Sequence, residues 1–179
     1  PLAERLQKDY PHLVSNYYRW DGITSIISKD DKTFREGIQL GDPSFLKMYG
    51  FSLMYGNQKE AFKNPYSVVI TAAKANKFFG RTNVLNETLT IQNFNGEQRQ
   101  FMISGVLDVT TENTVTKLTK DADNGFFIAD NSAAYFERAQ FDSWSLPIFV
   151  SFIELQPNVT VNQLAAPLKR LLREHTSET

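Results

Sequence analysis

The stretch SVVITAAKANKFFG, residues 67–80, has the pattern of a buried β-strand that runs directly into a short helix. Residues 68–70 are a β-branched run of the kind that fills buried strands. Thr71 can accept a free backbone N–H at the start of a helix over residues 72–79. Gly80 stands where a helix commonly ends in the left-handed conformation. In many enzymes such a strand-to-helix junction carries a nucleophile or a phosphate-binding loop, so these residues are candidates for an active site.

Thr71 and Lys74 have the spacing of the serine-x-x-lysine motif, in which a lysine activates a hydroxyl at a helix start. The hydroxyl here belongs to threonine, and the chain contains neither of the companion motifs S-D-N and K-T-G. Helix capping accounts for Thr71, and a solvated helix face accounts for Lys74. We therefore interpret the stretch as a structural joint and not as an active site.

The composition narrows the functional classes. The chain has 179 residues, of which 41% are hydrophobic and 22% charged, with a net charge of −1 and no cysteine. A chain of this length buries a substantial core, as one domain or as two small lobes. The balanced charge does not favour nucleic acid as a partner.

The absence of cysteine excludes disulfides and cysteine-ligated metal sites. The longest apolar-rich stretch, residues 146–155, is too short to span a bilayer. Because the chain begins at Pro1 and has no signal peptide, we expect a soluble fragment of a longer protein.

Other candidates for chemistry are weak. The segment DADNG, residues 121–125, resembles a calcium loop, but its glycine comes one residue early and position twelve is Ser132 instead of glutamate. His12 and His175 lie near opposite ends without a nearby ligand partner, which disfavours a zinc site or a catalytic triad. No G-x-S-x-G, Walker or G-x-G-x-x-G pattern occurs. The sequence thus predicts no catalytic, cofactor or metal site, and no enzyme.

Short hydrophobic patterns predict mixed strands and helices. Apolar residues four apart indicate a helix over residues 2–10, and Asp21-Gly22 is a strong hairpin signal between two strands. The segment KDDK, residues 29–32, predicts a polar turn before a third strand with Phe34, Ile38 and Leu40. A short helix is expected over residues 43–50.

The second half continues this mixture. A hairpin is predicted around Asn95-Gly96, a loop over residues 111–125, then a strand over 126–130 and a short helix over 131–139. The last helix shows a T-x-x-Q capping box at Thr160. It carries an apolar stripe of Val161, Leu164, Ala165, Leu168, Leu171 and Leu172, and Pro167 predicts a kink. Helices mixed with hairpins favour the α+β class, with helices packed on mixed or antiparallel sheets.

The order of these segments resembles the extracytoplasmic core domain of MacB/FtsX-type ABC transporter permeases. The positions that carry the resemblance are Asp42, Phe45, Gly50, Phe51 and Gly56, then residues 68–70, Ala72, Ala75, Phe79 and Gly80, and finally Ile103, Gly105 and Val106. The match is good from about residue 42 to 110 and fair over the last 30. The sequence departs from the family at Val84 and Asn86, where proline and glycine are usual, although asparagine tolerates the left-handed turn. It departs again at Thr110-Thr111, where a proline is usual.

The resemblance implies an architecture and a role. Residues 1–40 with 141–179 would form a membrane-proximal, porter-like lobe, and residues 41–140 an inserted distal lobe. The domain would lie outside the cytoplasmic membrane, tethered by transmembrane helices beyond this sequence, and would relay ATP-driven motion to an extracytoplasmic substrate or partner. The implied partners are a cytoplasmic ABC ATPase, a second permease copy or paralogue, and a periplasmic adaptor or substrate protein.

Two other classes stay open. A surface carbohydrate- or peptide-binding module would need several aromatic side chains on one exposed face. A hydrolase would need convergent polar groups in a deep pocket, for which the sequence offers no set. The transporter interpretation makes its own geometric prediction: both ends should lie on the same side of the fold, with the first and last helices roughly antiparallel.

Overall fold

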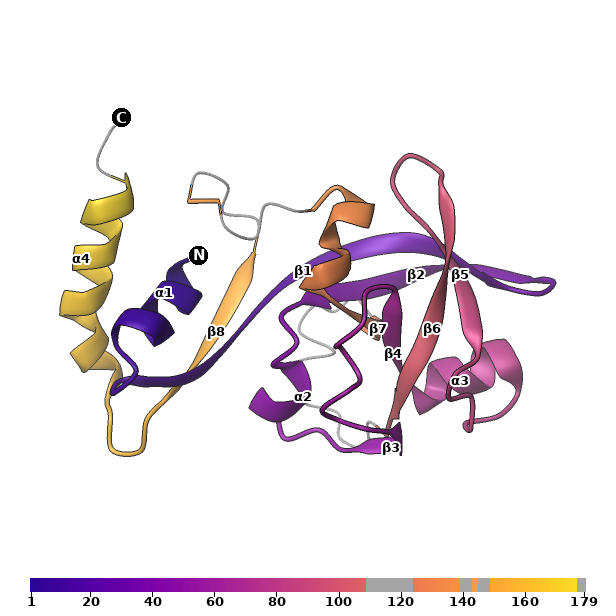
Figure 1. The fold of residues 1–179 in the computed structure, drawn as a ribbon, viewed down its shortest axis with the longest axis horizontal. Coiled ribbons are helices and arrows are strands. Elements are labelled where there is room, and N and C mark those ends of the chain that lie inside the picture. Colours follow the sequence, from indigo (N-terminus) through magenta and orange to yellow (C-terminus); the bar gives the residue numbers. More distant parts are fainter. Residues whose placement is uncertain (109–123, 139–142, 145–148, 177–179) are drawn as a thin grey trace.

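A computed structural model describes residues 1–108, 124–138, 143–144 and 149–176 of the chain. The fold is α+β, as predicted: eight strands belong to one sheet, and helices pack on it (Figure 1). The strands are β1 (Val14–Lys29), β2 (Lys32–Gly41), β3 (Leu53–Gly56), β4 (Ser67–Thr71), β5 (Thr88–Gln92), β6 (Gln98–Leu107), β7 (Asn124–Ala129) and β8 (Val150–Leu155). The helices are α1 (Leu2–Asp9), α2 (Phe45–Met48), α3 (Ala72–Phe79), the 3₁₀ turns η2 (Asp130–Phe136) and η3 (Val161–Leu164), and α4 (Ala165–Thr176).

Six of the strands close into a ring. They pair in the order β2-β7-β4-β6-β5-β1, and β1 pairs again with β2. The β2–β7 and β4–β6 pairs are parallel and the other four are antiparallel. β3 joins the outside of the ring along β6, and β8 pairs with β1. Closure leaves no open edge between the six strands, so their backbone groups satisfy one another.

The inside of the ring is the main hydrophobic core. Alternating residues of each strand point inward, as the twofold period of a strand requires. The core residues from the strands are Ile23, Ile27, Ile38, Leu40, Val68, Ile70, Leu89, Ile91, Phe101, Ile103, Val106, Phe126 and Ile128. α3 and η2 add Ala75, Phe78, Ala133 and Phe136 to the same cluster. The strand β4, residues 67–71, therefore lines this core through Val68 and Ile70.

The strand β1 corrects one prediction. Asp21-Gly22 is not a hairpin turn: both residues lie in the middle of β1, where Asp21 pairs with Leu40 and Gly22 with Gln39. The chain reverses instead at Asp30, which adopts a positive φ of 53°, in the predicted KDDK turn. The local turn preference of Asp-Gly gives way to ten consecutive pairs between β1 and β2.

The short helices follow the predicted signals. Thr71 Oγ1 accepts the backbone N–H of Lys74, and Gly80 ends α3 with φ of 71°. Gly50, after α2, also has a positive φ. Asn86 adopts φ of 66°, so the left-handed turn survives the absence of the family's glycine. The hairpin around Asn95-Gly96 is present, and the predicted strand and helix after residue 125 are β7 and η2.

The final helix differs from its prediction. The capping interaction is present, because Gln163 Oε1 accepts the backbone N–H of Thr160 at 2.7 Å. η3 then precedes α4, so Pro167 lies in the first turn of α4 and not inside one continuous helix from residue 161; the predicted kink stays a prediction. A proline costs little there, since N–H groups of the first turn have no intrahelical acceptor. Of the predicted stripe, Leu164 and Leu171 are buried, whereas Val161 and Leu172 are exposed.

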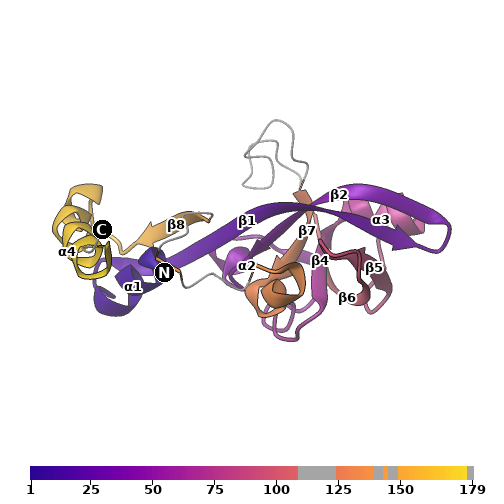
Figure 2. The same ribbon diagram turned by 90° about the horizontal axis from the view of Figure 1, so that it is seen from above.

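The first and last helices pack together at one end of the molecule. α1 and α4 share an apolar cluster with the beginning of β1 and the end of β8; this terminal cluster comprises Leu6, Leu13, Val14, Leu164 and Leu171, with partly buried neighbours. Figures 1 and 2 place the start of α1 and the end of α4 on the same side, with the two helices running in opposite directions. This is the arrangement of the ends that the sequence predicted.

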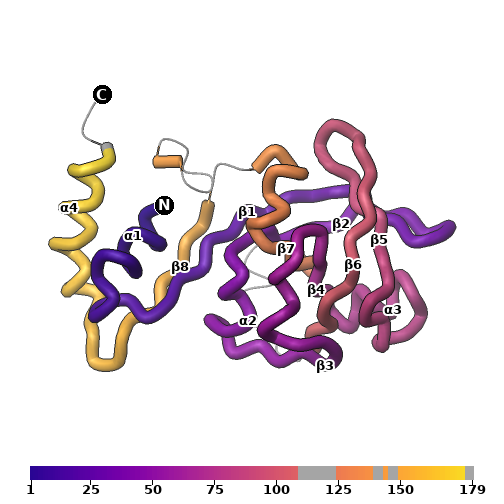
Figure 3. Tube along the Cα trace, viewed as in Figure 1, coloured from indigo at the N-terminus to yellow at the C-terminus, as the bar shows by residue number. Residues whose placement is uncertain are grey.

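Between the terminal cluster and the ring, β1 is the continuous connection (Figure 3). Its residues from Val14 to Trp20 pair with β8, and those from Trp20 onward pair with β2. The predicted division into lobes at residues 40/41 and 140/141 stays a prediction. The second boundary falls at residues 139–142, outside the described part of the chain, as does most of the predicted loop over residues 111–125.

The ring core predicts a strong dependence on Phe101. Its side chain is fully buried (0% exposed), so Phe101→Ala should lower the free energy of unfolding by about 3–5 kcal/mol. Phe94 provides the matched control because it is 48% exposed at the β5–β6 turn, and Phe94→Ala should cost less than about 1 kcal/mol. Urea unfolding of the two variants measures the difference; equal losses would contradict the assignment of the core.

Candidate functional site

The predicted joint at residues 71–74 is structural, but its lysine is not solvated. Lys74 is only 7% exposed, which corrects the interpretation of Lys74 as part of a solvated helix face. Its Nζ lies 2.7 Å from Glu36 Oε2, and Lys77 Nζ lies 2.6 Å from the other oxygen of the same carboxylate. The Lys74 stem packs against Gly125, where a Cβ would come within 2.5 Å of it. Lys74 thus anchors α3 to β2 through Glu36.

The other candidates do not converge. His175 stacks on Trp144 with ring centroids 4.2 Å apart, and His12 lies beside Tyr10. Residues 121–123 of the proposed calcium loop lie outside the described residues, while Asn124 and Gly125 begin β7. Within the described ranges, no group of three His, Asp or Glu side chains could hold a metal ion. The absence of a catalytic, cofactor or metal site stays a prediction.

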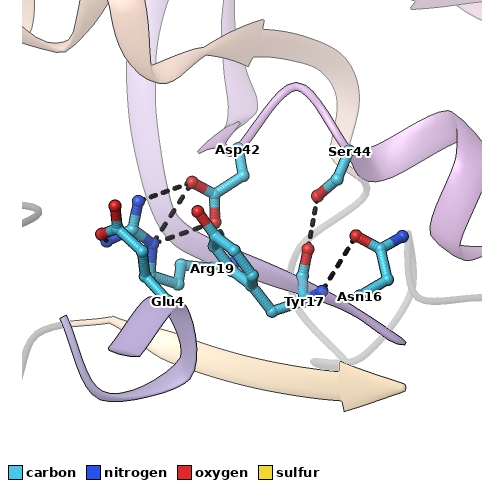
Figure 4. Close-up of polar contacts among 6 residues, drawn as sticks. All are labelled: Glu4, Asn16, Tyr17, Arg19, Asp42 and Ser44. Carbon is cyan, nitrogen blue, oxygen red and sulfur yellow. Dashed lines mark hydrogen bonds and ion pairs between the residues drawn. The ribbon is translucent and has the colours of Figure 1, made fainter. Parts of the chain in front are cut away.

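The densest buried polar arrangement at the boundary of the ring lies where β1 leaves β8 for β2. Arg19 on β1 and Asp42, directly after β2, are each only 4% exposed. Glu4 of α1 approaches from the terminal side, and Ser44 approaches from the start of α2 (Figure 4). We call Glu4, Tyr17, Arg19, Asp42 and Ser44 the polar junction.

Arg19 and Asp42 bind each other through both side chain and backbone. The guanidinium donates from Nη2 to Oδ1 at 2.7 Å and from Nε to Oδ2 at 3.0 Å, a two-point contact. The Arg19 backbone N–H donates to Oδ2 at 2.6 Å, and the Asp42 N–H donates to the Arg19 carbonyl at 3.0 Å. The pair therefore fixes the turn between β2 and α2 onto β1.

The remaining contacts tie other elements to this pair. Glu4 Oε2 lies 3.2 Å from Arg19 Nη1, and its side chain is 45% exposed. Ser44 Oγ donates to the Tyr17 carbonyl at 2.5 Å. The Tyr17 ring lies 5.3 Å from the Arg19 guanidinium carbon, in the range of a cation–π contact. Elements α1, β1 and α2 thus meet at one arginine.

Gly41 makes this approach possible. A Cβ at Gly41 would lie 2.5 Å from the Arg19 carbonyl oxygen and 2.6 Å from the Tyr18 hydroxyl. Tyr18 is itself buried, and its hydroxyl accepts from Gln39 Nε2 at 2.9 Å. On the side of α2, Phe45 stacks on Phe127 with centroids 4.5 Å apart and also contacts the Tyr18 ring. The junction is consequently backed by a packed aromatic cluster.

The electrostatics favour a permanent ion pair. Burial alone would lower the pKa of Arg19, but the hydrogen bonds and charge of Asp42 outweigh it and raise that pKa above its ordinary value. Burial raises the pKa of the Tyr17 hydroxyl to about 12, and the Asp42 carboxylate adds to the shift while Arg19 opposes it. The raised pKa values keep the Arg19 guanidinium charged and the Tyr17 hydroxyl protonated at neutral pH.

The sequence places Asp42 just before a short helix, and no pattern in it singles out Arg19. The two residues are 23 apart, and no local pattern links them. The sequence places Arg19 directly between Tyr18 and Trp20, and a charged side chain that is buried there needs a carboxylate partner.

The junction predicts a large cost for Asp42→Asn. The substitution leaves the Arg19 charge buried without its counter-ion, so the free energy of unfolding should fall by about 3–5 kcal/mol. Glu4→Gln removes the half-exposed partner of the same arginine and should cost less than about 1 kcal/mol. Chemical denaturation of both variants tests this; comparable costs would show that Asp42 does not dominate the junction.

Tyr17 predicts a loss of stability at alkaline pH. Because its folded-state pKa is raised from 10.0 to about 12, its contribution is complete below pH 10 and is lost as the pH rises through 12. Tyr17→Phe should make the decline of the free energy of unfolding between pH 10 and 12 shallower, by up to the slope that the release of one proton produces. Burial also raises the pKa of Tyr18 and Tyr49, which leaves a background slope in both proteins. Identical slopes for the parent and the variant would contradict the assignment.

Comparison with known proteins places this geometry in a family. The family model of the MacB-like periplasmic core domain matches residues 1–171. No curated protein sequence matches the chain. In the described residues, no helix is both long and apolar enough to cross a membrane.

Three solved structures share the fold. A domain named for a permease protein from Porphyromonas gingivalis has a TM-score of 0.78 at 21% identity, covering 98% of this chain and 76% of that one. The periplasmic region of MacB from Actinobacillus actinomycetemcomitans has a TM-score of 0.66 at 15% identity, with coverages of 97% and 72%. The extracellular domain of the noncanonic ABC-type transporter YknZ from Gram-positive bacteria gives 0.63 at 11% identity, with coverages of 99% and 83%. The chain belongs to the MacB-like periplasmic core domain family, and it shares its fold with the periplasmic region of MacB and with the extracellular domain of an ABC-type transporter.

Proposed function

We propose that this domain relays ATP-driven motion of its permease to a substrate or partner outside the cytoplasmic membrane. The observation that carries the proposal is the polar junction. The buried Arg19–Asp42 pair connects the strand that leaves the terminal cluster to the turn between β2 and α2. Motion applied to α1 and α4 then reaches the ring as displacement of a stiff element.

The arrangement of the ends supports the same proposal. α1 begins and α4 ends on one side of the molecule, and the two helices pack on each other in the terminal cluster (Figure 2). Helices that continue from both ends into one membrane would move the terminal cluster as a unit. The domain would be tethered in this way, on the periplasmic side.

The partners follow from the proposed role. A cytoplasmic ABC ATPase would drive the permease, a second permease copy or paralogue would complete the assembly, and a periplasmic adaptor or substrate protein would receive the motion. The domain itself would hold no cofactor and perform no hydrolysis. The described residues offer no metal-binding group that contradicts this.

The alternative is a surface module that binds carbohydrate or peptide. Such a module would present several aromatic side chains on one exposed face. In the described part of the chain, the exposed aromatic side chains are Phe34 on β2 and Phe94 at the β5–β6 turn. Phe34 packs edge-on against Phe78, and the Arg138 guanidinium lies over Phe94. These two separate rings do not favour the alternative.

The relay can be tested in the complete permease, reconstituted with its ATPase in lipid nanodiscs. Environment-sensitive fluorophores are attached at Lys169→Cys on α4 or at Gln98→Cys on the ring, both exposed positions. Addition of ATP should change the fluorescence at both sites, whereas ADP should not. Since the described domain has no cysteine, each label is unique within it.

The Asp42→Asn substitution then distinguishes the fluorescence response at position 98 from the response at position 169. In variant protein that far-UV circular dichroism and a thermal melt show to be folded, weakening the junction should preserve ATP hydrolysis and the response at position 169, and should reduce the response at position 98 by at least half. An ATP-insensitive fluorophore at both sites of the parent protein would overturn the relay. An undiminished response at position 98 in the variant would remove the junction from it.

A further inference from the structure

Helix α1 spans a stretch of β1 and touches it at two polar points. Gln7 Nε2 donates to the Ser15 carbonyl at 3.1 Å, and Glu4 reaches Arg19 at 3.2 Å. Gln7 and Glu4 are three residues apart and lie on one helix face. Their contacts on β1 are four residues apart, about 13 Å along a strand. The same helix buries Ala3 and Leu6. The helix α1 therefore lies along residues 15–19 of β1 and braces this stretch.

The stretch of β1 that α1 braces begins at a β-bulge. The pairing of β1 with β8 shifts register between Val14 and Asn16, which pair with Leu155 and Glu154. Ser15 is the extra residue, and its Oγ donates to the Glu154 carbonyl at 3.1 Å. A bulge of this kind bends a strand and interrupts the ladder locally. Val14 belongs to the terminal cluster, whereas Tyr18 packs in the aromatic cluster beside the ring, so the bulge separates the two.

The contacts of Arg19 with Asp42 and with Glu4 are not equally strong. Arg19 is held by Asp42 through three hydrogen bonds from its side chain and one from its backbone. Its contact with Glu4 is a single bond of 3.2 Å to a carboxylate that is 45% exposed. Water and salt reach Glu4, so this bond can open while Arg19 stays in place.

We propose that α1 is a releasable brace across the β1 bulge, and that Glu4–Arg19 is its latch. With the latch closed, the terminal cluster and the ring keep one orientation. With the latch open, β1 and β8 bend at Ser15 and Glu154, and the terminal cluster tilts relative to the ring. The inference deepens the proposed relay, because it names the point at which motion enters the domain, but its test needs neither ATP nor a membrane.

The test measures the distance between the terminal cluster and the ring in the isolated 179-residue chain. Spin labels are placed at Lys169→Cys on α4 and Gln98→Cys on β6, and double electron–electron resonance gives the distance distribution. In low salt, the labelled protein should give one narrow peak. Glu4→Gln should broaden the distribution at least twofold or add a second peak, while far-UV circular dichroism stays unchanged.

Two controls separate the latch from general loosening. Glu60→Gln removes an exposed carboxylate that pairs with Lys63 far from the bulge, and it should leave the distribution narrow. Raising the salt concentration to about 1 M should broaden the distribution of the parent protein through screening, and should change the Glu4→Gln distribution little.

The outcomes decide the proposal. A Glu4→Gln distribution that superimposes on the parent's, or an equal broadening by Glu60→Gln, overturns the latch. If Glu4→Gln does not fold, the salt series on the unsubstituted Glu4 protein decides, and a salt-independent distribution overturns the proposal. A latch that opens as expected while ATP produces no movement in the permease would leave the brace intact and refute the relay.

Discussion

The buried ion pair between Arg19 and Asp42 is the constraint on which the arrangement of the two ends of the molecule depends. A guanidinium taken out of water needs a counter-ion and hydrogen-bond acceptors, and here one carboxylate supplies both from a single turn. Because that turn joins β2 to α2, satisfying Arg19 also fixes where the chain goes after the ring strand. Gly41 leaves room for the approach. The same arginine also donates from Nη1 to Glu4 of α1, so that α1, β1 and the turn between β2 and α2 share one charge.

A second buried ionic cluster holds the opposite side of the ring. Glu36 of β2 accepts from Lys74 and Lys77 of α3, and Lys32 donates to the carbonyls at the end of that helix. The positive charge of Lys32 near the C-terminus of α3 also complements the dipole of that helix. These contacts fasten α3 to the β1–β2 hairpin, whose tip extends beyond the other elements at this end of the molecule (Figure 1). The ring is thus tied on one side to a helix and on the other to the polar junction.

The chemistry of the molecule agrees with its family. The described charged groups of the junction are paired, and those with shifted pKa values are shifted away from neutral pH, which suits a structural part. What distinguishes the domain from a simple closed barrel is the extension of β1. This single strand belongs to the ring in its second half and to the terminal cluster at its beginning. The bulge at Ser15 lies between these two roles, so stiffness and a bend are built into neighbouring residues of one strand.

The sequence by itself determined the local elements, the fold class and the family. Thr71 and Gly80 bound a helix because capping and left-handed termination are interactions within a few residues, and Asn95-Gly96 makes a turn for the same reason. Tertiary structure decided everything that depends on partners distant in the chain. Asp21-Gly22 became mid-strand because pairing along β2 outweighs a two-residue turn preference. Lys74 was drawn inside by Glu36, 38 residues away, and Arg19 by Asp42, since a buried charge is placed by its counter-ion and not by its neighbours in sequence.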